Sequence, residues 1–478
     1  MTGTGLSHKL FKLLSSIIAY KYTLFFCFHN EIRFFFVTLP LKMTMRTEEL
    51  YSYFQKSSGV TTDTRSCREG TMFFALRGER FNGNQYAQAA LEAGCTYAVV
   101  DDRDVYDASN PRLLFVDNTL KALQALARYH RRQLGLPIIG ITGTNGKTTT
   151  KELIAAVLSR KFRTHFTQGN LNNSIGVPLT LLQLSHEHEL AVVEMGASHP
   201  GDIRELVEIA EPDCGLITNV GRAHLEGFGS FEGVIHTKGE LYDFLREREG
   251  GFVFLNDNDP ILKDLAKGLR TCCYGTGEKQ EGRLVYGEVL DCNPYLSFRW
   301  STTDEHGRDV QTQLVGRYNI DNVLCAAAVG THFGVSPDDI NEAIRSYKPT
   351  NSRSQLLKTE HNTLIVDAYN ANPTSMKAAL ENFAQIEGEK KMVILGEMKE
   401  LGEASEEEHL AILQLLSTLD FQQVWTIGHN FSNALFPFRN FENVEAAIQA
   451  VQAERPEGMT VLIKGSNSVH LPQLIPHL

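Results

Sequence analysis

The amino-acid sequence predicts an α/β protein of three domains, and three observations support this. The chain has 478 residues, enough for about three ordinary domains. From residue 118 onward, apolar runs rich in β-branched residues alternate with segments of helical periodicity. A hydrophobic content of 42% is normal for a globular core. We therefore expect a small N-terminal α/β domain at 45–117, a central α/β domain of the mononucleotide-binding type at 118–349, and a C-terminal Rossmann-like, doubly wound domain at 350–478.

Charge and cysteine usage narrow the classes of function. The formal net charge of −11 argues against a general nucleic-acid-binding protein, although a basic cleft could exist within an acidic whole. The eight cysteines include no Cys-x-x-Cys pair and no spacing typical of a metal site. We interpret them as reduced thiols and expect a cytoplasmic monomer without a nucleic-acid partner.

Residues 1–44 differ from the rest of the chain. Aromatic clusters at 25–26 and 34–36 are mixed with charged and polar residues, and no apolar stretch approaches the roughly 20 residues that span a bilayer. Residues 13–20 resemble a signal peptide only faintly, because no small-residue cleavage site follows. We expect no stable membrane insertion, and a working protein that begins at Met43 or Met45 after an extension outside the fold.

The first globular segment has the pattern of a small α/β unit. Strands are predicted at 72–76 and 97–100, with a helix at 87–93 between them. The first strand lies between Thr61-Thr-Asp-Thr-Arg65 and the turn Arg77–Gly83. On residue types alone, Thr-Asp-Thr-Arg suits a turn and helix cap as well as a ligand site.

A phosphate-binding loop is the strongest local signal in the central domain. An amphipathic helix at 119–134 precedes the apolar strand Leu136–Thr142, the glycine loop Gly143–Gly146 and a second helix. Glycines let backbone N–H groups approach phosphates, and the helix N-terminus adds positive potential. Lys147 can then reach the terminal phosphates, and the Thr148 hydroxyl can ligate Mg²⁺. The spacing is shorter than the usual motif, which has a glycine where Ile141 stands.

Two further strands end in polar residues. Glu194 stands near the end of the strand Leu190–Met195, and His224 follows the strand Cys214–Val220. In open α/β sheets, ligands bind beyond the carboxyl ends of strands, so Lys147, Glu194 and His224 are expected to share a site. Each also has a structural explanation: a salt bridge for Glu194 and a satisfied structural histidine for His224.

The remaining elements complete the predicted architecture. Residues 251–315 predict a strand, a short helix and a β meander, and Gly316–Asn322 leads into an Ala-rich helix at 323–333. In the last domain, strands alternate with helices, which predicts a parallel, doubly wound sheet. The predicted strands are 363–368, 392–395, 424–427 and 461–463, and the helices are 374–386, 406–416 and 444–453.

These stretches resemble, in order, the Mur ligase family of ATP-dependent amino-acid ligases of peptidoglycan synthesis. Gly143–Thr149 is similar to the family's nucleotide loop, and Gly316–Asn322 is similar to its adenine-side motif. Lys238, placed by its sequence at a helix start and ordinarily a solvated lysine there, matches a lysine carbamylated in many members. The family's metal-site positions and the arginine that opens its last domain are matched by Glu194, His224, Lys238 and Arg353.

Other stretches resemble the branch of the family that adds a dipeptide. They are Thr62–Arg65, Phe73–Gly78, Asn170–Pro178, Asp367–Pro373, Leu395–Met398 and Glu400–Gly402. The Asp-Asn-Pro-Arg signature of the ligase that adds the third residue is absent from the sequence. One departure is Asn467, where the family commonly has arginine. The resemblance implies that D-alanyl-D-alanine is joined to UDP-N-acetylmuramoyl-tripeptide through an acyl phosphate.

The resemblance also implies a role for individual residues. It implies ATP, two Mg²⁺ sites and a carbamylated Lys238, with the UDP end held by the N-terminal domain. Implied catalytic residues are Lys147, His224, Lys238 and Arg353, and implied metal ligands are Thr148, Glu194, His224 and Lys238. Implied nucleotide contacts are Gly143, Thr144, Asn145, Gly146, Lys147, Thr148, Thr149, Asn319, Asn322, Arg353 and Asp367. Implied substrate contacts are Asp63, Thr64, Arg65, Asn170, Asn172, Asn173, Asn370 and Asn372.

Other functions remain open on the sequence. Another Mur-type ligase or a folylpolyglutamate-type ligase would use the same chemistry, although the latter should lack the N-terminal segment. A P-loop kinase or a nucleotide-dependent switch protein is the alternative from a different class. A kinase would release ADP without any need for a dipeptide. An assay in which each substrate is left out in turn therefore distinguishes a kinase from a ligase.

Overall fold

The computed structural model describes residues 27–28, 31–32, 44–303, 307–349, 353–388 and 390–478. The described residues divide into two compact units, one of residues 44–58 with Thr62–Thr119 and one of Gly59–Thr61 with Leu120–Leu478. The predicted extension at 1–44 lies outside the described residues, apart from Thr44 and the antiparallel pair β1 (Cys27–Phe28) and β2 (Glu31–Ile32). Residues 350–352, which directly follow the predicted boundary at 349/350, are also not described. The predicted domain boundaries at 117/118 and 349/350 therefore stay predictions.

The first unit is a small α/β fold, as predicted. Its parallel strands are β4 (Thr71–Phe74), β7 (Tyr97–Val100) and β8 (Leu113–Phe115), and α3 (Ala87–Glu92) connects β4 to β7. Buried side chains such as Phe73 and Leu91 form its core between sheet and helix. Its other elements are α2 (Thr47–Phe54), η1 (Thr64–Ser66), β5 (Arg77–Gly78), β6 (Phe81–Asn82) and η2 (Gly83–Tyr86).

The second unit begins with a nine-stranded sheet. In it β9 (Ile138–Thr142) lies between β11 (Leu190–Glu194) and β12 (Cys214–Ile217), all parallel. The full strand order is β10-β11-β9-β12-β13-β14-β15-β16-β17. The other strands are β10 (Thr164–Phe166), β13 (Phe252–Asn256), β14 (Arg270–Thr276), β15 (Arg283–Cys292), β16 (Tyr295–Thr302) and β17 (Arg308–Val315). The predicted meander is confirmed, because β15, β16 and β17 pair antiparallel in sequence order.

Helices cover both faces of this sheet. On one face, Ile139 and Ile141 of β9 pack in a core with α5 (Lys147–Leu158) and α11 (Ile320–His332). On the other face, Gly140 leaves room for Leu241 of α9 (Phe231–Glu247), which packs against α7 (Asp202–Ala210). Further helices are α4 (Thr119–Leu134), α6 (Gly176–Leu181), α8 (Leu225–Phe228), α10 (Pro260–Leu265), η3 (Arg317–Asn319) and α12 (Pro337–Ser346).

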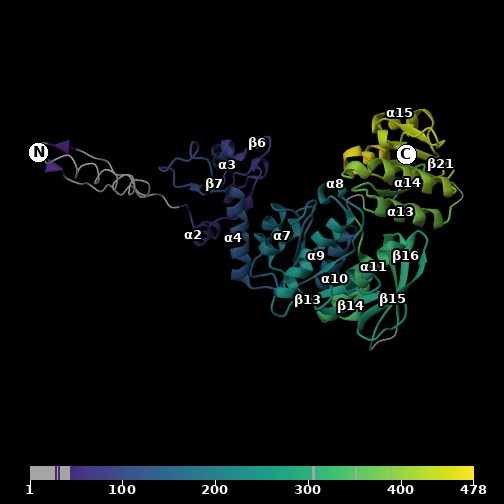
Figure 1. The fold of residues 1–478 in the computed structure, drawn as a ribbon, viewed down its shortest axis with the longest axis horizontal. Coiled ribbons are helices and arrows are strands. Elements are labelled where there is room, and N and C mark those ends of the chain that lie inside the picture. The colour runs from purple at the N-terminus through teal and green to yellow at the C-terminus, as the bar shows by residue number, and fades with distance from the viewer. Residues whose placement is uncertain (1–26, 29–30, 33–43, 304–306, 350–352, 389) are drawn as a thin grey trace, which may run out of the picture. The chain divides into compact units, whose positions relative to one another are not determined.

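The C-terminal part is a doubly wound sheet of order β18-β19-β23-β20-β21-β22. Its strands are β18 (Gln355–Lys358), β19 (Thr363–Asp367), β20 (Lys391–Gly396), β21 (Gln423–Ile427), β22 (Arg439–Phe441) and β23 (Thr460–Lys464). The helices are α13 (Pro373–Gln385), α14 (Ser405–Thr418), α15 (Val444–Ala453), η4 (Gly402–Ala404), η5 (His429–Phe431), η6 (Asn467–Val469) and η7 (Leu471–His477). Successive residues of a strand face opposite sides of the sheet. One side packs against α13 and α14, and the other packs against α15 and η7, so helices cover both faces (Figure 1). The predicted parallel sheet is confirmed, with two unpredicted strands: β18, which pairs antiparallel to β19, and β22, which pairs parallel to β21.

No helix within the described part of the chain is both long and apolar enough to cross a membrane. The seven cysteines whose side chains are described are free thiols.

Candidate functional site

The glycine loop connects β9 to α5 and is braced by the end of β12. The backbone N–H of Thr144 donates to the Asn219 carbonyl at 2.9 Å, and the Asn145 N–H donates to the Asn219 side chain at 3.0 Å. The Thr218 hydroxyl donates to the Asn145 carbonyl at 2.7 Å. A Cβ on Gly143 would lie 2.0 Å from the Thr218 hydroxyl, so this close approach requires glycine. The loop is therefore held rigidly at the carboxyl end of the sheet.

Lys147 begins α5 and turns back over the loop. Its Nζ donates to the carbonyls of Gly143 and Thr144 at 2.7 and 2.9 Å. Burial lowers the pKa of Lys147 to about 8, and Arg353 contributes in the same direction while the Glu194 carboxylate opposes the shift. An anionic ligand in front of the loop would offset this loss and stabilise the ammonium.

Glu194 ends β11 and is almost fully buried. Its Oε2 accepts from the Thr148 hydroxyl at 3.0 Å, and its Oε1 accepts from Asn172 Nδ2 at 2.8 Å. A hydroxyl and a carboxylate side by side are oxygen donors of the kind that Mg²⁺ prefers, so the pair Thr148 and Glu194 fits a magnesium ion. No group of three or more His, Cys, Asp or Glu side chains that could hold a metal occurs among the described residues. The predicted metal ligands do not form such a group, because two of the four are a threonine and a lysine.

One cavity of 660 Å³ in the second unit collects most of the predicted site. Loop residues, polar residues of the central sheet and residues of the C-terminal part line it together. The predicted site residues in its lining are Thr144, Asn145, Gly146, Lys147, Thr148, Asn170, Asn172, Asn173, Glu194, His224, Arg353 and Asn370. Gly143, Thr149, Lys238, Asn319, Asn322, Asp367 and Asn372 also belong to this unit but are not in the lining.

His224 lies in the cavity wall and contacts the C-terminal part of the unit. It is the residue before α8, with a left-handed φ of 51°, and its Nδ1 pairs with the Glu400 carboxylate. The hydrogen bond from His224 holds the pKa of Glu400 below its usual value. The His224 ring also packs edge-on against Phe228, 6.2 Å between centroids.

Lys238 is buried in the middle of α9, so the prediction of a helix-start lysine was wrong about its local position. It is 2% exposed because α9 packs against both α7 and the sheet. Its Nζ lies over the Phe228 ring, 5.4 Å from the centroid, so one aromatic ring contacts both His224 and Lys238. Burial lowers the pKa of Lys238 well below its usual value, and the Lys147 charge adds to this while Asp202 and Glu240 oppose it.

The C-terminal residues reach the site in two ways. Arg353 stacks on the Tyr369 ring at 3.9 Å, and both side chains line the cavity. Asn372 donates to the Asn145 side chain at 2.7 Å, which joins the C-terminal part to the glycine loop. Asp367 is instead occupied by Lys464, whose Nζ donates to it at 2.6 Å.

Asn319 and Asn322 connect α11 to the loop helix. The Thr150 hydroxyl donates to Asn322 Oδ1 at 2.9 Å, and Asn322 Nδ2 donates to Asn319 Oδ1 at 2.9 Å. A Cβ on Gly146, whose φ is 77°, would lie 2.7 Å from Asn322 Oδ1. Both asparagines therefore support the loop from behind.

The predicted residues of the first unit form their own cluster. Asp63 caps η1 by accepting from the Arg65 N–H at 2.9 Å, and its carboxylate also accepts from the Arg65 guanidinium at 3.0 Å. Arg65 is exposed and Asp63 is half-buried, and Thr64 lies between them at the start of η1. The motif therefore forms a turn and helix cap, as its residue types suggest, and it also leaves a pair of polar groups accessible to a ligand.

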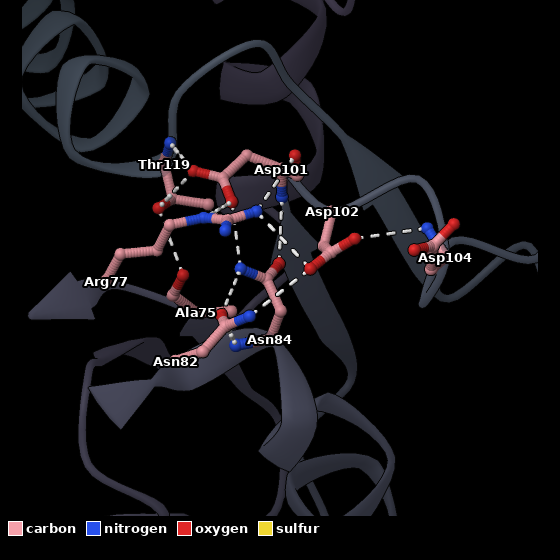
Figure 2. Close-up of polar contacts among 8 residues, drawn as sticks. All are labelled: Ala75, Arg77, Asn82, Asn84, Asp101, Asp102, Asp104 and Thr119. Atoms are coloured by element: carbon pink, nitrogen blue, oxygen red, sulfur yellow. Dashed lines mark hydrogen bonds and ion pairs between the residues drawn. The ribbon is translucent and has the colours of Figure 1, made fainter. Parts of the chain in front are cut away.

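A second polar network in this unit fixes the turn after β4. Figure 2 shows Arg77 between Asp101 and Asp102, with Nε 2.8 Å from Asp101 Oδ1. Asp101 also accepts from Asn84 at 2.8 Å and from the Thr119 N–H at 3.0 Å. Burial alone would raise the pKa of Asp101, but these hydrogen bonds outweigh it and hold the pKa below its usual value.

Among the cavity and near-cavity residues that were not predicted, Glu400, Tyr369 and Lys151 make contacts with predicted site residues. Glu400 and Tyr369 lie in stretches that resemble the family but were given no role, and Lys151 follows a run of threonines on α5. Lys151 is fully buried, with Nζ 3.7 Å from Glu194 Oε2. Its spacing of four residues from Lys147 on one helix is the signal that could have identified it.

Three family models match consecutive parts of the chain. They are the "Mur ligase family, catalytic domain" at residues 56–131, the "Mur ligase middle domain" at 141–330 and the "Mur ligase, glutamate ligase domain" at 352–467. Together they extend over both units of the fold.

Characterised proteins and solved structures match over nearly the same range. The UDP-N-acetylmuramoyl-tripeptide–D-alanyl-D-alanine ligase of Bacillus subtilis is 37% identical over 432 residues, 88% of this chain and 93% of the relative. Its Escherichia coli counterpart is 34% identical, over 87% and 92%. A crystal structure of MurF from Acinetobacter baumannii has a TM-score of 0.79 at 31% identity, covering 91% of this chain and 98% of that one. MurF from Thermotoga maritima in complex with ADP has a TM-score of 0.77 at 26% identity, covering 89% and 97%.

Proposed function

The chain belongs to the Mur ligase family, and on that premise we propose that it joins D-alanyl-D-alanine to UDP-N-acetylmuramoyl-tripeptide at the expense of ATP, releasing ADP and phosphate. The observation that carries the proposal is the 660 Å³ cavity. Its walls combine a phosphate loop, a buried carboxylate beside a threonine, an asparagine-rich loop and residues of the C-terminal part. A kinase site needs only the first two of these features.

The reaction that we propose has two steps. The terminal carboxylate of the tripeptide attacks the γ-phosphorus of ATP, so an acyl phosphate forms and ADP leaves. The dipeptide amine then attacks the acyl carbon, loses a proton and expels inorganic phosphate, which leaves an amide bond. A carboxylate and a triphosphate repel each other, and the first step therefore needs concentrated positive charge.

Lys147 and Arg353 supply that charge from opposite parts of the unit. Lys147 is held against the loop carbonyls, ready to turn toward phosphate oxygens, and Arg353 is aligned by the Tyr369 ring. Thr148 and Glu194 would hold a magnesium ion, which would neutralise charge on the phosphates. Asn170, Asn172 and Asn173 are assigned to the sugar-peptide, and Asn370 and Asn372 to the dipeptide side.

Lys238 is the residue that we assign to carbamylation. A carbamate forms when a neutral amine attacks the carbon of CO₂ and loses a proton, so a lysine with a lowered pKa is required. Burial and the nearby Lys147 charge favour the neutral amine of Lys238. The product would be an oxygen ligand next to His224 for a second magnesium ion. In the structure His224 Nδ1 pairs with Glu400, which leaves Nε2 of the ring as the nitrogen that could ligate the ion.

The N-terminal residues Asp63, Thr64 and Arg65 are assigned to the UDP end of the substrate. Asn319, Asn322 and Asp367 are assigned to the nucleotide, the two asparagines through their support of the loop helix. A cytoplasmic, monomeric enzyme remains our prediction.

The test is an omission assay of phosphate release. Wild-type protein is incubated with Mg²⁺, ATP, UDP-N-acetylmuramoyl-tripeptide and D-alanyl-D-alanine, and each component is left out in turn. We expect release only with all of them, and a product whose mass equals that of both substrates joined minus water. Turnover without the dipeptide would indicate a kinase or an ATPase. Equal turnover with single amino acids would point to another ligase of the family.

A further inference from the structure

Lys151 is a buried cation for which the reaction outlined above has no role. It lies one helical turn after Lys147 on α5 and is 0% exposed. Its Nζ is 3.7 Å from Glu194 Oε2 and 3.8 Å from Glu152 Oε1, and it lies 5.7 Å from the centroid of the Phe166 ring. Within the described residues, this Nζ is one of the buried polar atoms without a hydrogen-bond partner.

Packing does not explain a lysine at this position. An ammonium removed from water costs several kcal/mol unless it is paired at short range, and good ion pairs are about 2.7–2.9 Å long. Burial lowers the pKa of Lys151, and the opposing carboxylates, Glu194 first and Glu152 second, act from a longer distance. A methionine would fill the same slot against Phe166 without that cost. The charge is therefore better explained by its effect on a neighbour.

Glu194 is the neighbour that the geometry indicates. Its Oε1 is held by Asn172 at 2.8 Å, whereas its Oε2 receives the Thr148 hydroxyl at 3.0 Å and faces Lys151 from the helix. Glu152 is less suited to be the target, because its other oxygen already accepts from the Tyr347 hydroxyl at 2.7 Å. Lys151 thus lies behind the two oxygen donors that fit a magnesium ion.

We propose that Lys151 is a positioning residue of the ligase site, whose ammonium holds the Glu194 carboxylate in the orientation in which Oε2 and the Thr148 hydroxyl together bind magnesium. The proposal rests on the proposed function, which assigns Thr148 and Glu194 to that ion. Lys151 itself contacts neither nucleotide nor metal in this scheme. Outer residues that orient a metal ligand typically change metal affinity or activity by about 10–100-fold when removed.

Lys151→Met tests the proposal because it keeps the length and the burial of the side chain and removes the charge. Binding of ADP is measured by calorimetry at saturating Mg²⁺ and again in EDTA, and the melting temperature is recorded. We expect the Mg²⁺-dependent gain in ADP affinity to fall roughly tenfold. The Mg²⁺ concentration for half-maximal ligase activity should rise by a similar factor, with kcat largely restored at high Mg²⁺.

Three further variants separate positioning from stability. Lys161→Met removes a lysine shortly after the same helix, whose Nζ donates to the Phe333 and Gly334 carbonyls, and should keep the wild-type Mg²⁺ response. Glu152→Gln should also keep it. Lys151→Arg retains a cation and should recover most of the response, and it provides a second reading if Lys151→Met folds poorly.

Some results would overturn the inference. One is a Lys151→Met protein with an unchanged Mg²⁺ response. If only its melting temperature falls, the lysine has a purely structural role, and if neither quantity changes, the lysine has no role in the site. Another is a Glu152→Gln protein that reproduces the defect, because the lysine would then act through Glu152. Absence of dipeptide-dependent turnover in the wild type would instead overturn the proposed function, and the ADP binding comparison would remain valid.

Discussion

Two buried lysines of the second unit differ in the partners of their side-chain nitrogen. One lies in the C-terminal sheet and the other beside the nine-stranded sheet. Lys464, at the end of β23 in the C-terminal sheet, is 1% exposed and donates to Asp367 at 2.6 Å and to the Asn370 carbonyl at 3.3 Å. Lys238, beside the central sheet, is 2% exposed, and within the described residues its Nζ has no hydrogen bond or ion pair. Burial lowers the pKa of Lys238 well below its usual value.

The difference separates a structural site from a chemical one. A paired cation keeps its charge and fixes the loop that it contacts, here the residues after β19. For Lys238, burial outweighs the opposing Asp202 and Glu240 carboxylates, so the lowered pKa favours the neutral, nucleophilic amine. At the carboxyl edge of the C-terminal sheet, the C-terminal edge, the buried charge is thus paired within the protein. The carboxyl edge of the nine-stranded sheet, the central edge, is instead left with positive groups that need an anionic ligand.

The largest expected effect is on activity at the central edge. Lys238→Ala should lower kcat by about 100-fold or more, because an electrostatic group at the reacting centre typically contributes that much. Because truncation of a buried side chain also leaves a cavity, the melting temperature is recorded to separate a loss of folding from a loss of catalysis. Short carboxylic acids should restore part of the activity by supplying the missing carboxylate, which steady-state kinetics with added acetate or formate would show. Full activity in Lys238→Ala would contradict the assignment.

The opposite pattern is expected for Lys464→Met. It leaves the partly exposed Asp367 without its partner, and we expect a loss of about 2–3 kcal/mol in the free energy of unfolding. Urea denaturation would measure this, and Asp367→Asn introduced into the variant should recover part of the loss. A stable Lys464→Met protein would remove the contrast between the two edges.

Glycine substitutions sharpen the comparison further. Gly146→Ala at the central edge would bring a Cβ to 2.7 Å from Asn322 Oδ1 at a φ of 77°, and Gly428→Ala at the C-terminal edge would clash with Glu397 at a φ of 117°. Each should cost about 1–3 kcal/mol of stability. Only Gly146→Ala should also weaken ADP binding, by roughly tenfold, because it deforms the loop. Calorimetric titration of both variants distinguishes them, and equal ADP affinity would show that the loop tolerates the change.

The smallest effect concerns pH and the loop that carries Glu400. His409 is fully buried, with Nδ1 donating to the Ser405 carbonyl at 2.6 Å and Nε2 accepting from the Met398 N–H at 3.1 Å. Burial lowers the pKa of His409, although the Ser405 hydrogen bond opposes the shift. The unfolded chain therefore binds a proton below about pH 6.5 that the folded chain does not. Stability from this group is present above that pH and is lost as the pH falls.

His409→Gln should remove that acid sensitivity. Between about pH 6.5 and 5.5 the wild type should lose up to about 1 kcal/mol relative to the variant. Melting temperatures measured over this range in both proteins would show converging stabilities. Parallel curves would mean that His409 titrates alike in the folded and unfolded states.

Much of the fold followed from local sequence signals. The alternation of strands and helices, the meander after β14 and the glycine loop were predicted because period, glycine placement and apolar runs act over a few residues. The antiparallel strand β18 was not predicted, because its four residues Gln355–Lys358 carry no pattern that distinguishes an edge strand from a loop.

The site divides along the same line. The sequence by itself determined the loop Gly143–Thr148 and the positions of Glu194 and His224 after strands, because parallel strands bring their carboxyl ends to one edge. Only the tertiary structure decided that Lys238 and Lys151 are buried, that Glu400 meets His224 and that Asp367 is occupied by Lys464. Burial and pairing depend on elements distant in the chain, and they set the charge state of a lysine, which no local pattern of residues can specify.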